Sequence, residues 1–281
     1  MLLAASYSPL LRAALVEDLG SGDLTTEATV APDTRARASA VARRPLVVCG
    51  RDVFFAVFRE VDPSVTCEGL AEEGARVDRG DVLWRVDGPA RSLLMAERVA
   101  LNFVQRMSGV ATVTRSYVEA LAPGSSTRIT DTRKTTPGLR LLERHAVRVG
   151  GGHNHRDNLG AAVMIKDNHI IAAGGIASAV SRARAHAPHT SRIEVEVANL
   201  DELEQALAAR ADIIMLDNFD DAQVKAAVAR VRGAALLEVS GGITLERIRT
   251  LSSMGVDVIS VGALTHSAPS ADIALDLELA P

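Results

Sequence analysis

Lysine is rare in this sequence, and one of its three copies stands beside an arginine where chemistry is expected. The chain has 31 basic side chains, of which only Lys134, Lys166 and Lys225 are lysines. Lys134 follows Arg133 directly in the stretch DTRKTTPG, after a predicted strand. Arginine is a planar fork that can grip a carboxylate or phosphate through two hydrogen bonds, whereas lysine is a compact, mobile charge. The pair therefore indicates an anion site that uses both kinds of cation.

More cationic residues follow in the stretches VGGGHNHRDN and AVMIKD. Three glycines allow the backbone to approach a ligand closely. The His153-x-His155 spacing could suggest a metal, but typical catalytic zinc sites have three protein ligands and the sequence offers no third one nearby. An anion pocket explains the same residues more simply. Its predicted members are Arg133, Lys134, His155, Arg156 and Lys166.

Two acidic residues end neighbouring predicted strands. Glu196 closes the run IEVEV and Asp217 closes IIMLD. Carboxylates that face a basic pocket suit Mg²⁺, which binds one or two carboxylates together with substrate phosphates. Strand alternation puts Glu194 and Glu196 on the same side, so the sequence leaves open which of them enters the site. A structural ion pair with a nearby cation is the alternative to metal binding.

Glycine-rich turns follow the last two predicted strands. They are SGG, Ser240 to Gly242, and the turn at Gly262. Such turns before helices expose backbone N–H groups to an anion. The last two βα loops of α/β barrels are a frequent phosphate site. The pair of turns therefore predicts a phosphomonoester site.

The elements that must position these residues alternate between strands and helices. From Arg128 onward six short β-branched runs end in polar residues, and the last four ends are 20 to 23 residues apart. This rhythm predicts βαβ units and a parallel sheet whose carboxyl ends form one rim. A complete barrel takes about 250 residues, so we expect an incomplete barrel of about six strands; an open, doubly wound sheet remains the alternative.

The first part of the chain has another organisation. Residues 1–115 mix short strands, Gly-punctuated turns and a long helix and do not alternate βα units, which predicts a separate domain. The barrel domain is expected at 116–265, with the tail 266–281 packing back on the first domain. On the long helix Arg98, Asn102 and Gln105 form a polar stripe, which is either a functional surface or an ordinary exposed face.

Composition excludes several classes of protein. A formal net charge of −4 argues against general binding to nucleic acid or to a membrane surface. Cys49 and Cys67 make no disulfide framework and have no metal-ligand spacing, so two reduced thiols in a cytoplasmic protein are expected. The apolar N-terminus lacks a basic region and is predicted to be a core-facing helix. Aromatic residues are 3% of the chain, so Ala, Val, Leu and Ile should build the core.

These motifs resemble quinolinate phosphoribosyltransferase, the carboxylating nicotinate-nucleotide pyrophosphorylase. The resemblance runs nearly end to end and is most specific in DTRKTTPGLRLLERHAVRVGGGHNHR and IKDNHI. It implies an N-terminal open-faced α/β sandwich and an incomplete α/β barrel. It also implies a homodimer in which one subunit's N-terminal domain covers the other's barrel mouth; a hexamer of dimers is left open.

The resemblance also implies roles for individual residues. Arg133 and Arg156, with Lys134, His155 and Lys166, should bind the two quinolinate carboxylates, and Arg98 should reach in from the neighbouring subunit. Glu196 and Asp217 should hold Mg²⁺ and the ribose hydroxyls of phosphoribosyl pyrophosphate. Ser240, Gly241, Gly242 and Gly262 should cradle its 5′-phosphate. Lys134, Lys166, Glu196 and Asp217 are the expected catalytic group.

The implied reaction belongs to NAD biosynthesis and yields nicotinate mononucleotide, pyrophosphate and CO₂. One departure from the family pattern is Asp157, where a larger apolar residue is expected; its carboxylate could compete for the charge of Arg156. Three alternatives remain: a paralogue associated with molybdenum uptake, a barrel decarboxylase or aldolase that uses Lys166 as a base or Schiff-base lysine, and a non-catalytic phosphate-binding scaffold.

Overall fold

The computed structural model describes residues 2–280 and divides into two compact units. The first unit comprises the residues up to Arg115, residues Thr136–Gly151 and the segment from Ser267. The second comprises Ser116–Thr135 and Gly152–His266. Residues 136–151, which the expected boundaries place in the barrel domain, therefore cluster with the first unit. No helix within residues 2–280 has the length and apolarity that a membrane span needs.

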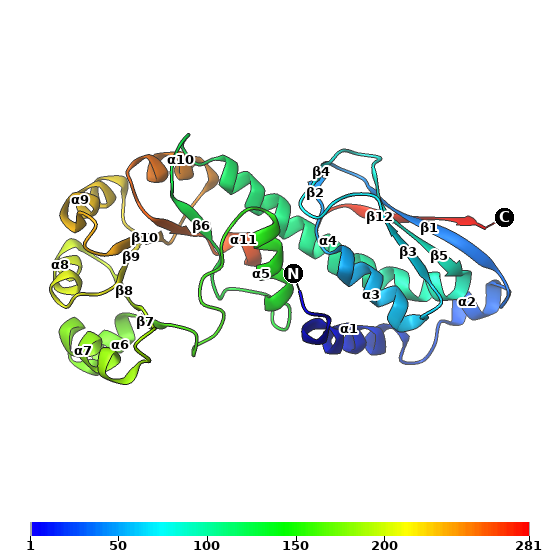
Figure 1. Cartoon of the computed structure of the whole chain (residues 1–281), viewed down its shortest axis with the longest axis horizontal. Helices are drawn as coiled ribbons and strands as arrows, with labels where there is room; N and C mark the ends of the chain where they lie inside the picture. Colours follow the sequence, from blue (N-terminus) through cyan, green and yellow to red (C-terminus); the bar gives the residue numbers. More distant parts are fainter. Residues whose placement is uncertain (1, 281) are drawn as a thin grey trace. The chain divides into compact units, whose positions relative to one another are not determined.

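A four-stranded antiparallel sheet forms the centre of the first unit (Figure 1). Its order is β12-β1-β5-β3, built from β12 (Ile273–Leu279), β1 (Arg35–Ala42), β5 (Val82–Pro89) and β3 (Thr66–Gly69). The short strands β2 (Leu46–Val47) and β4 (Arg76–Val77) pair separately. Because β12 pairs with β1 along seven residues, from Ala36↔Leu279 to Ala42↔Ile273, the C-terminal tail completes this sheet.

The helices of the first unit are α1 (Ala4–Leu19), α2 (Leu24–Thr29), α3 (Arg51–Val61), the long α4 (Ala90–Glu119), whose last residues belong to the second unit, and α5 (Arg140–Val149). Leu11 and Leu15 of α1 are buried, as their helical spacing predicts. The core differs from expectation in one respect. Phe54, Phe58 and Trp84 are fully buried, and the Phe54 ring contacts the other two in tilted arrangements, with centroids 4.9 Å from Phe58 and 5.0 Å from Trp84. The few aromatic residues are therefore concentrated here.

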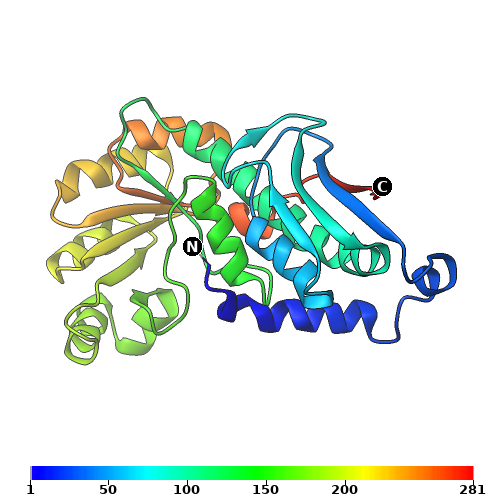
Figure 2. The same cartoon turned by 45° about the vertical axis from the view of Figure 1, so that its right-hand side comes forward.

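The second unit is a six-stranded parallel sheet with helices on its outer side (Figures 1 and 2). The strand order is β6-β11-β10-β9-β8-β7, from β6 (Arg128–Thr130), β11 (Val258–Ser260), β10 (Leu236–Ser240), β9 (Ile213–Asp217), β8 (Ile193–Val197) and β7 (Val163–Ile165). The helices are α6 (Asp167–Ala173), α7 (Ile176–His186), α8 (Leu200–Ala208), α9 (Asp221–Val231), α10 (Leu245–Ser253) and α11 (Ala263–His266). β6 and β7 are the two edge strands of this sheet and do not pair with each other in the described residues, so the barrel is incomplete.

All six strands lie where the sequence predicts them, and the predicted fold is confirmed. Aliphatic strand residues that alternate with the polar ones, such as Val195, Ile214 and Val239, are fully buried. Asp217 stands opposite Ser240 in the register of β9 and β10, and Glu196 stands opposite Met215. Because parallel strands end on the same side, these polar residues share one rim.

Candidate active site

A cavity of about 620 Å³ lies at this rim, a volume typical of small-molecule sites. Residues from the stretches DTRKTTPG, VGGGHNHRDN and AVMIKD and from the SGG turn line it, together with the two acidic residues at strand ends. The lining consists of Thr132, Arg133, Lys134, His155, Arg156, Met164, Lys166, Glu196, Met215, Asp217, Asn218, Ser240, Gly241, Gly242 and Ser260. All these residues belong to the second unit. The structure therefore brings ten of the twelve predicted site residues to one concavity and leaves Gly262 and Arg98 outside its lining.

The loop after β6 holds Arg133 and Lys134 by its backbone. The Lys134 N–H donates to Oγ1 of Thr132 at 3.1 Å, and the buried Thr265 hydroxyl donates to the Lys134 carbonyl at 2.7 Å. Since these bonds use only main-chain groups of Lys134, its exposed side chain can follow a ligand.

Asp131 is a support beneath this loop and does not line the cavity. Its side chain is completely buried. Its carboxylate accepts hydrogen bonds from Nδ2 of Asn154 and from the backbone N–H of His155 at 2.7 Å. The parallel bridge between Thr130 and His153 joins the same two segments. These contacts hold the HNHR segment against β6. Asp131, which directly follows β6, therefore supports the loop from below the rim and does not face the cavity.

His155 is engaged on both ring nitrogens. The Arg156 backbone N–H donates to Nδ1 at 2.8 Å, while Nε2 lies 3.3 Å from Glu194 and 3.5 Å from Glu238. Both carboxylates are buried. This geometry leaves no free N–H of His155 for a substrate carboxylate. His155 thus holds the Arg156 segment through Nδ1, and it also lines the cavity.

The protons of this triad are coupled. Burial lowers the pKa of His155, but the hydrogen bonds and charges of Glu194 and Glu238 outweigh it and raise that pKa to about 10. Burial raises the pKa of Glu194 above its usual value, and the Glu238 charge adds to this although His155 opposes it. Nε2 of the ring, which faces both carboxylates, carries the hydrogen that they stabilise. Glu194 therefore lies below the site, and Glu196 is the residue that enters it.

Arg133 and Arg156 converge on the same space. Burial lowers the pKa of Arg156, the charge of Arg133 lowers it further, and Glu194 partly compensates. The Arg156 guanidinium is tethered by a 3.1 Å hydrogen bond to the Ala162 carbonyl. Two guanidinium groups that repel each other in one cavity are stabilised when an anion binds between them. Asp157 is exposed, outside the lining, and is not among the charges that shift this pKa.

The acidic side of the cavity is formed by Glu196 and Asp217. The Lys166 ammonium forms an ion pair with Glu196. Asp217 accepts a hydrogen bond from Nδ2 of Asn218 at 2.9 Å. Carboxylates from adjacent strands that face one cavity are a donor set that fits Mg²⁺. The ion-pair alternative is also realised, because Glu196 has a lysine partner before any ligand binds.

The glycine turn after β10 is packed tightly against Asn218. Gly241 has a φ of +85° and Gly242 a φ of +58°, both in the left-handed region that side chains disfavour. A Cβ on Gly241 would lie 2.3 Å from Oδ1 of Asn218. Gly262 contributes differently: a Cβ there would lie 3.3 Å from Cδ of Lys134. Gly262 therefore leaves space for that lysine, although it does not line the cavity.

Replacing Gly241 with alanine should raise the KM for the phosphorylated substrate by about ten- to a hundredfold, from a strain of about 1–2 kcal/mol plus the clash with Asn218. Initial rates at varied concentrations of the phosphorylated substrate that the resemblance implies, phosphoribosyl pyrophosphate, measure this effect. Gly255→Ala is the matched control. Its φ is +88° and no heavy atom lies within 4 Å of its Cβ, so it tests left-handed strain without the clash. Equal KM values in the two variants would contradict the assigned role.

Some residues of the cavity could not be recognised in the sequence. Met164, Met215 and Ser260 line it, but apolar and small residues at strand ends look the same whether they pack or bind. Asn218 carries a clearer signal, because it directly follows the predicted strand-end Asp217. His153 is exposed and lies outside the lining, so the residues described show no metal site built on the His-x-His spacing.

Comparison with known proteins agrees with this geometry. Residues 23–108 match the N-terminal domain of quinolinate phosphoribosyl transferase, and residues 110–276 match its C-terminal domain. The carboxylating nicotinate-nucleotide pyrophosphorylase of Mycobacterium leprae is 47% identical over 95% of both chains. A probable enzyme of that name in Bacillus subtilis is 42% identical over 96% of this chain and 93% of its own. The crystal structure of NadC from Streptococcus pyogenes superposes with a TM-score of 0.96 at 43% identity and covers 100% of this chain and 99% of that one. The chain therefore belongs to the quinolinate phosphoribosyl transferase family.

Proposed function

We propose that this chain transfers the phosphoribosyl group of phosphoribosyl pyrophosphate to quinolinate with loss of CO₂, and so forms nicotinate mononucleotide for NAD biosynthesis. The observation that carries this proposal is the single cavity in which Arg133, Lys134, Arg156 and Lys166 face Glu196, Asp217 and the glycine turn. Its cations suit a pyridine dicarboxylate, its carboxylates suit magnesium, and its turn suits a phosphate.

The substrates have separate places in the cavity. Arg133 and Arg156 bind the quinolinate carboxylates, with Lys134 and Lys166 beside them and His155 beneath. The backbone N–H groups of Ser240, Gly241 and Gly242 bind the 5′-phosphate. Glu196 and Asp217 hold Mg²⁺ and the ribose hydroxyls. When bound, the metal neutralises charge on the pyrophosphate that leaves.

The chemistry follows from this arrangement. The quinolinate nitrogen forms a bond to the anomeric carbon as the bond from that carbon to pyrophosphate breaks, and pyrophosphate keeps the electron pair. Glu196 stabilises the positive charge that develops on the ribose. The cationic pyridinium ring then accepts the electron pair of the bond to the 2-carboxylate, CO₂ leaves, and a proton takes its place on the ring carbon. Lys134 and Lys166 remain close to the charges that move.

We further propose that the enzyme is a homodimer in which Arg98 of one subunit completes the site of the other; further assembly of dimers stays open. Arg98 is exposed on α4 and belongs to the first unit, whereas the cavity is lined by the second. Gln105, in contrast, donates from Nε2 to the Ile273 carbonyl at 2.7 Å and supports the fold. We place the enzyme in the cytoplasm, which two free cysteines support.

Release of labelled CO₂ from 2-carboxyl-labelled quinolinate tests the reaction. We expect release only when both phosphoribosyl pyrophosphate and Mg²⁺ are present, with one pyrophosphate formed per CO₂. Nicotinate should not react, because it lacks the second carboxylate that the two arginines bind. Pyrophosphate formation with nicotinate at the same rate, or binding of phosphoribosyl pyrophosphate without any turnover, would refute the proposal.

A further inference from the structure

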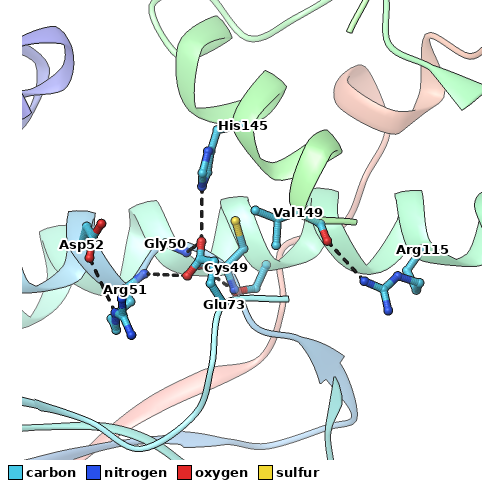
Figure 3. Close-up of polar contacts among 9 residues, drawn as sticks. Cys49, Gly50, Arg51, Asp52, Glu73, Arg115, His145 and Val149 are labelled. Atoms are coloured by element: carbon cyan, nitrogen blue, oxygen red, sulfur yellow. Dashed lines mark hydrogen bonds and ion pairs between the residues drawn. The ribbon is translucent and has the colours of Figure 1, made fainter. Parts of the chain in front are cut away.

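Three side chains with different donor atoms meet in the first unit, at a place that the reaction does not use. Cys49 precedes α3, Glu73 lies in the turn before β4, and His145 lies on α5 (Figure 3). One Sγ, one carboxylate oxygen and one imidazole nitrogen lie within 4.8 Å of one another. Nε2 of His145 is 3.3 Å from Oε1 of Glu73. The sequence separates these residues too widely to suggest that they meet.

The backbone holds the first two of these residues in place. The Cys49 N–H donates to the buried Ser108 hydroxyl at 3.1 Å. The Gly50 N–H donates to Oε1 of Glu73 at 2.8 Å and the Arg51 N–H donates to Oε2 at 3.4 Å (Figure 3). The Glu73 carboxylate thus lies at the N-terminus of α3. Both side chains are oriented before any ligand binds, which lowers the cost of forming a site.

The His145 imidazole has fewer polar contacts than Cys49 and Glu73. Nδ1 of His145 is buried and has no hydrogen-bond partner within residues 2–280. The ring is held by the contact of its Nε2 with Glu73. Metal binding requires the hydrogen to move from Nε2 to Nδ1, which gives up the hydrogen bond to Glu73 in exchange for a metal–nitrogen bond. Nε2 then presents its lone pair toward the Cys49 sulfur and the Glu73 carboxylate.

Access and charge favour a cation over a second organic ligand. Cys49 is fully buried, whereas the side chains of His145 and Glu73 are 14% and 29% exposed. A small ion can therefore arrive past Glu73. A thiolate, a carboxylate and a neutral imidazole together carry two negative charges, which a divalent cation neutralises in a place that water reaches poorly.

We propose that Cys49, Glu73 and His145 bind a divalent transition-metal ion of the zinc class. Sulfur, imidazole nitrogen and a carboxylate oxygen are the ligands that Zn²⁺ takes in proteins, and three protein ligands are typical of sites that keep one position for water. On binding, the thiol releases its proton to solvent and a metal–sulfur bond forms. The ion links the segment before α3, the turn before β4 and helix α5.

Without the ion, the thiol is a poor nucleophile. Burial raises the pKa of Cys49 well above its usual range, and the charge of Glu73, which accepts the thiol hydrogen, raises it further. For Glu73, burial raises the pKa, but hydrogen bonds from His145, Gly50, Arg51 and Cys49 outweigh burial and lower it. A role in redox chemistry is therefore disfavoured, and the ionised carboxylate is ready to accept a cation.

Titration of the full-length protein with Co²⁺ under anaerobic, reducing-agent-free conditions tests the site. A thiolate bound to Co²⁺ gives a sulfur-to-metal charge-transfer band in the near ultraviolet, which oxygen and nitrogen ligands do not give. We expect this band to saturate at one ion per chain and to disappear when Zn²⁺ is added. The acidic cavity of the second unit and its His155 cluster contain no cysteine, and the thioether sulfurs of Met164 and Met215 cannot become thiolates, so ions bound there stay silent in this band.

Matched variants locate the sulfur. Cys49→Ser keeps the size and a hydroxyl donor for Glu73 and should lose the band, while Cys67→Ser, the other free cysteine, should keep it. His145→Gln should keep the band and weaken Co²⁺ affinity more than about tenfold, as the loss of a ligand exceeds the loss of an outer partner. Zn²⁺ should raise the melting temperature of the wild type and of Cys67→Ser, but not of Cys49→Ser.

The outcomes that overturn the proposal are equally specific. Absence of the band in the wild-type protein refutes it without any variant. A band that survives in Cys49→Ser and disappears in Cys67→Ser would show that the sulfur of Cys67, and not that of Cys49, binds the metal. If Cys49→Ser does not fold, His145→Gln decides, since unchanged affinity in that variant means that the three residues form only a hydrogen-bonded cluster.

Discussion

Arg133→Ala should lower kcat/KM for quinolinate by about a hundred- to a thousandfold, because truncating one partner of a buried, hydrogen-bonded charge pair costs 2–5 kcal/mol. Arg133 and Arg156 share one cavity, and the charge of the first lowers the pKa of the second. A bound dianion is the group that relieves this repulsion. Initial rates at varied quinolinate and saturating phosphoribosyl pyrophosphate measure the effect.

Two charge-conserving variants separate shape from charge. Arg133→Lys should recover only part of the loss, because an ammonium cannot form the bidentate contact with a carboxylate. Lys134→Arg should lower kcat more than it changes KM, because a planar fork cannot follow a charge that moves during the reaction. Arg192→Ala is the control: Arg192 is exposed at the start of β8, at the end opposite to Glu196. Full turnover by Lys134→Arg would disprove the division of labour between the two cations.

The second large effect concerns stability of the first unit. Glu143→Gln should lower its free energy of unfolding by about 3 kcal/mol, because breaking a buried ion pair leaves an uncompensated charge. The Glu143 side chain is completely buried. It accepts hydrogen bonds from Nε and Nη2 of Arg106 at 2.9 and 2.8 Å and from the Thr136 backbone at 3.1 Å. Arg106 in turn donates to the Ala268 carbonyl at 2.6 Å.

Urea unfolding followed by tryptophan fluorescence measures this loss in the correct unit. Trp84 is the only tryptophan of the chain and lies in the core of the first unit. The matched control is Glu60→Gln, which removes the exposed pair of Glu60 with Arg12 in the same unit. An exposed pair is worth about 0–1 kcal/mol, so this variant should unfold nearly as the wild type does. Equal midpoints for the two variants would show that Glu143 is not a structural anchor.

Much of the site follows from local patterns. A strand has a period of two, and parallel strands end on one side, so the polar residues that close six runs must share a rim. The sequence therefore predicts one pocket for five features: Arg133, Lys166, Glu196, Asp217 and the turn at Ser240. The resemblance in the 131–169 block then narrowed a general anion site to a pyridine dicarboxylate and an activated sugar.

Local sequence patterns do not predict how far below the rim of the sheet a side chain lies. Glu194 and Glu196 are equivalent by alternation, yet Glu194 meets His155 below the cavity and Glu196 enters it. His155, expected among the residues that bind the substrate carboxylates, lines the cavity, and its Nδ1 accepts from a backbone N–H while Nε2 lies near two buried carboxylates. Asp131 is buried beneath the loop that it begins. Sequence spacing predicts the side of a strand that a residue faces, but not the layer in which its partners lie.

The sequence by itself determined the six strands, their common rim, the cations and acids at that rim and the family. The tertiary structure alone decided that residues 136–151 cluster with the first unit, that β12 closes its sheet on β1, and that Cys49, Glu73 and His145 meet. The physical reason is range. Strand and helix periods are set by neighbouring residues and can be seen in a short stretch of sequence, whereas a contact between residues 72 positions apart depends on how whole elements pack.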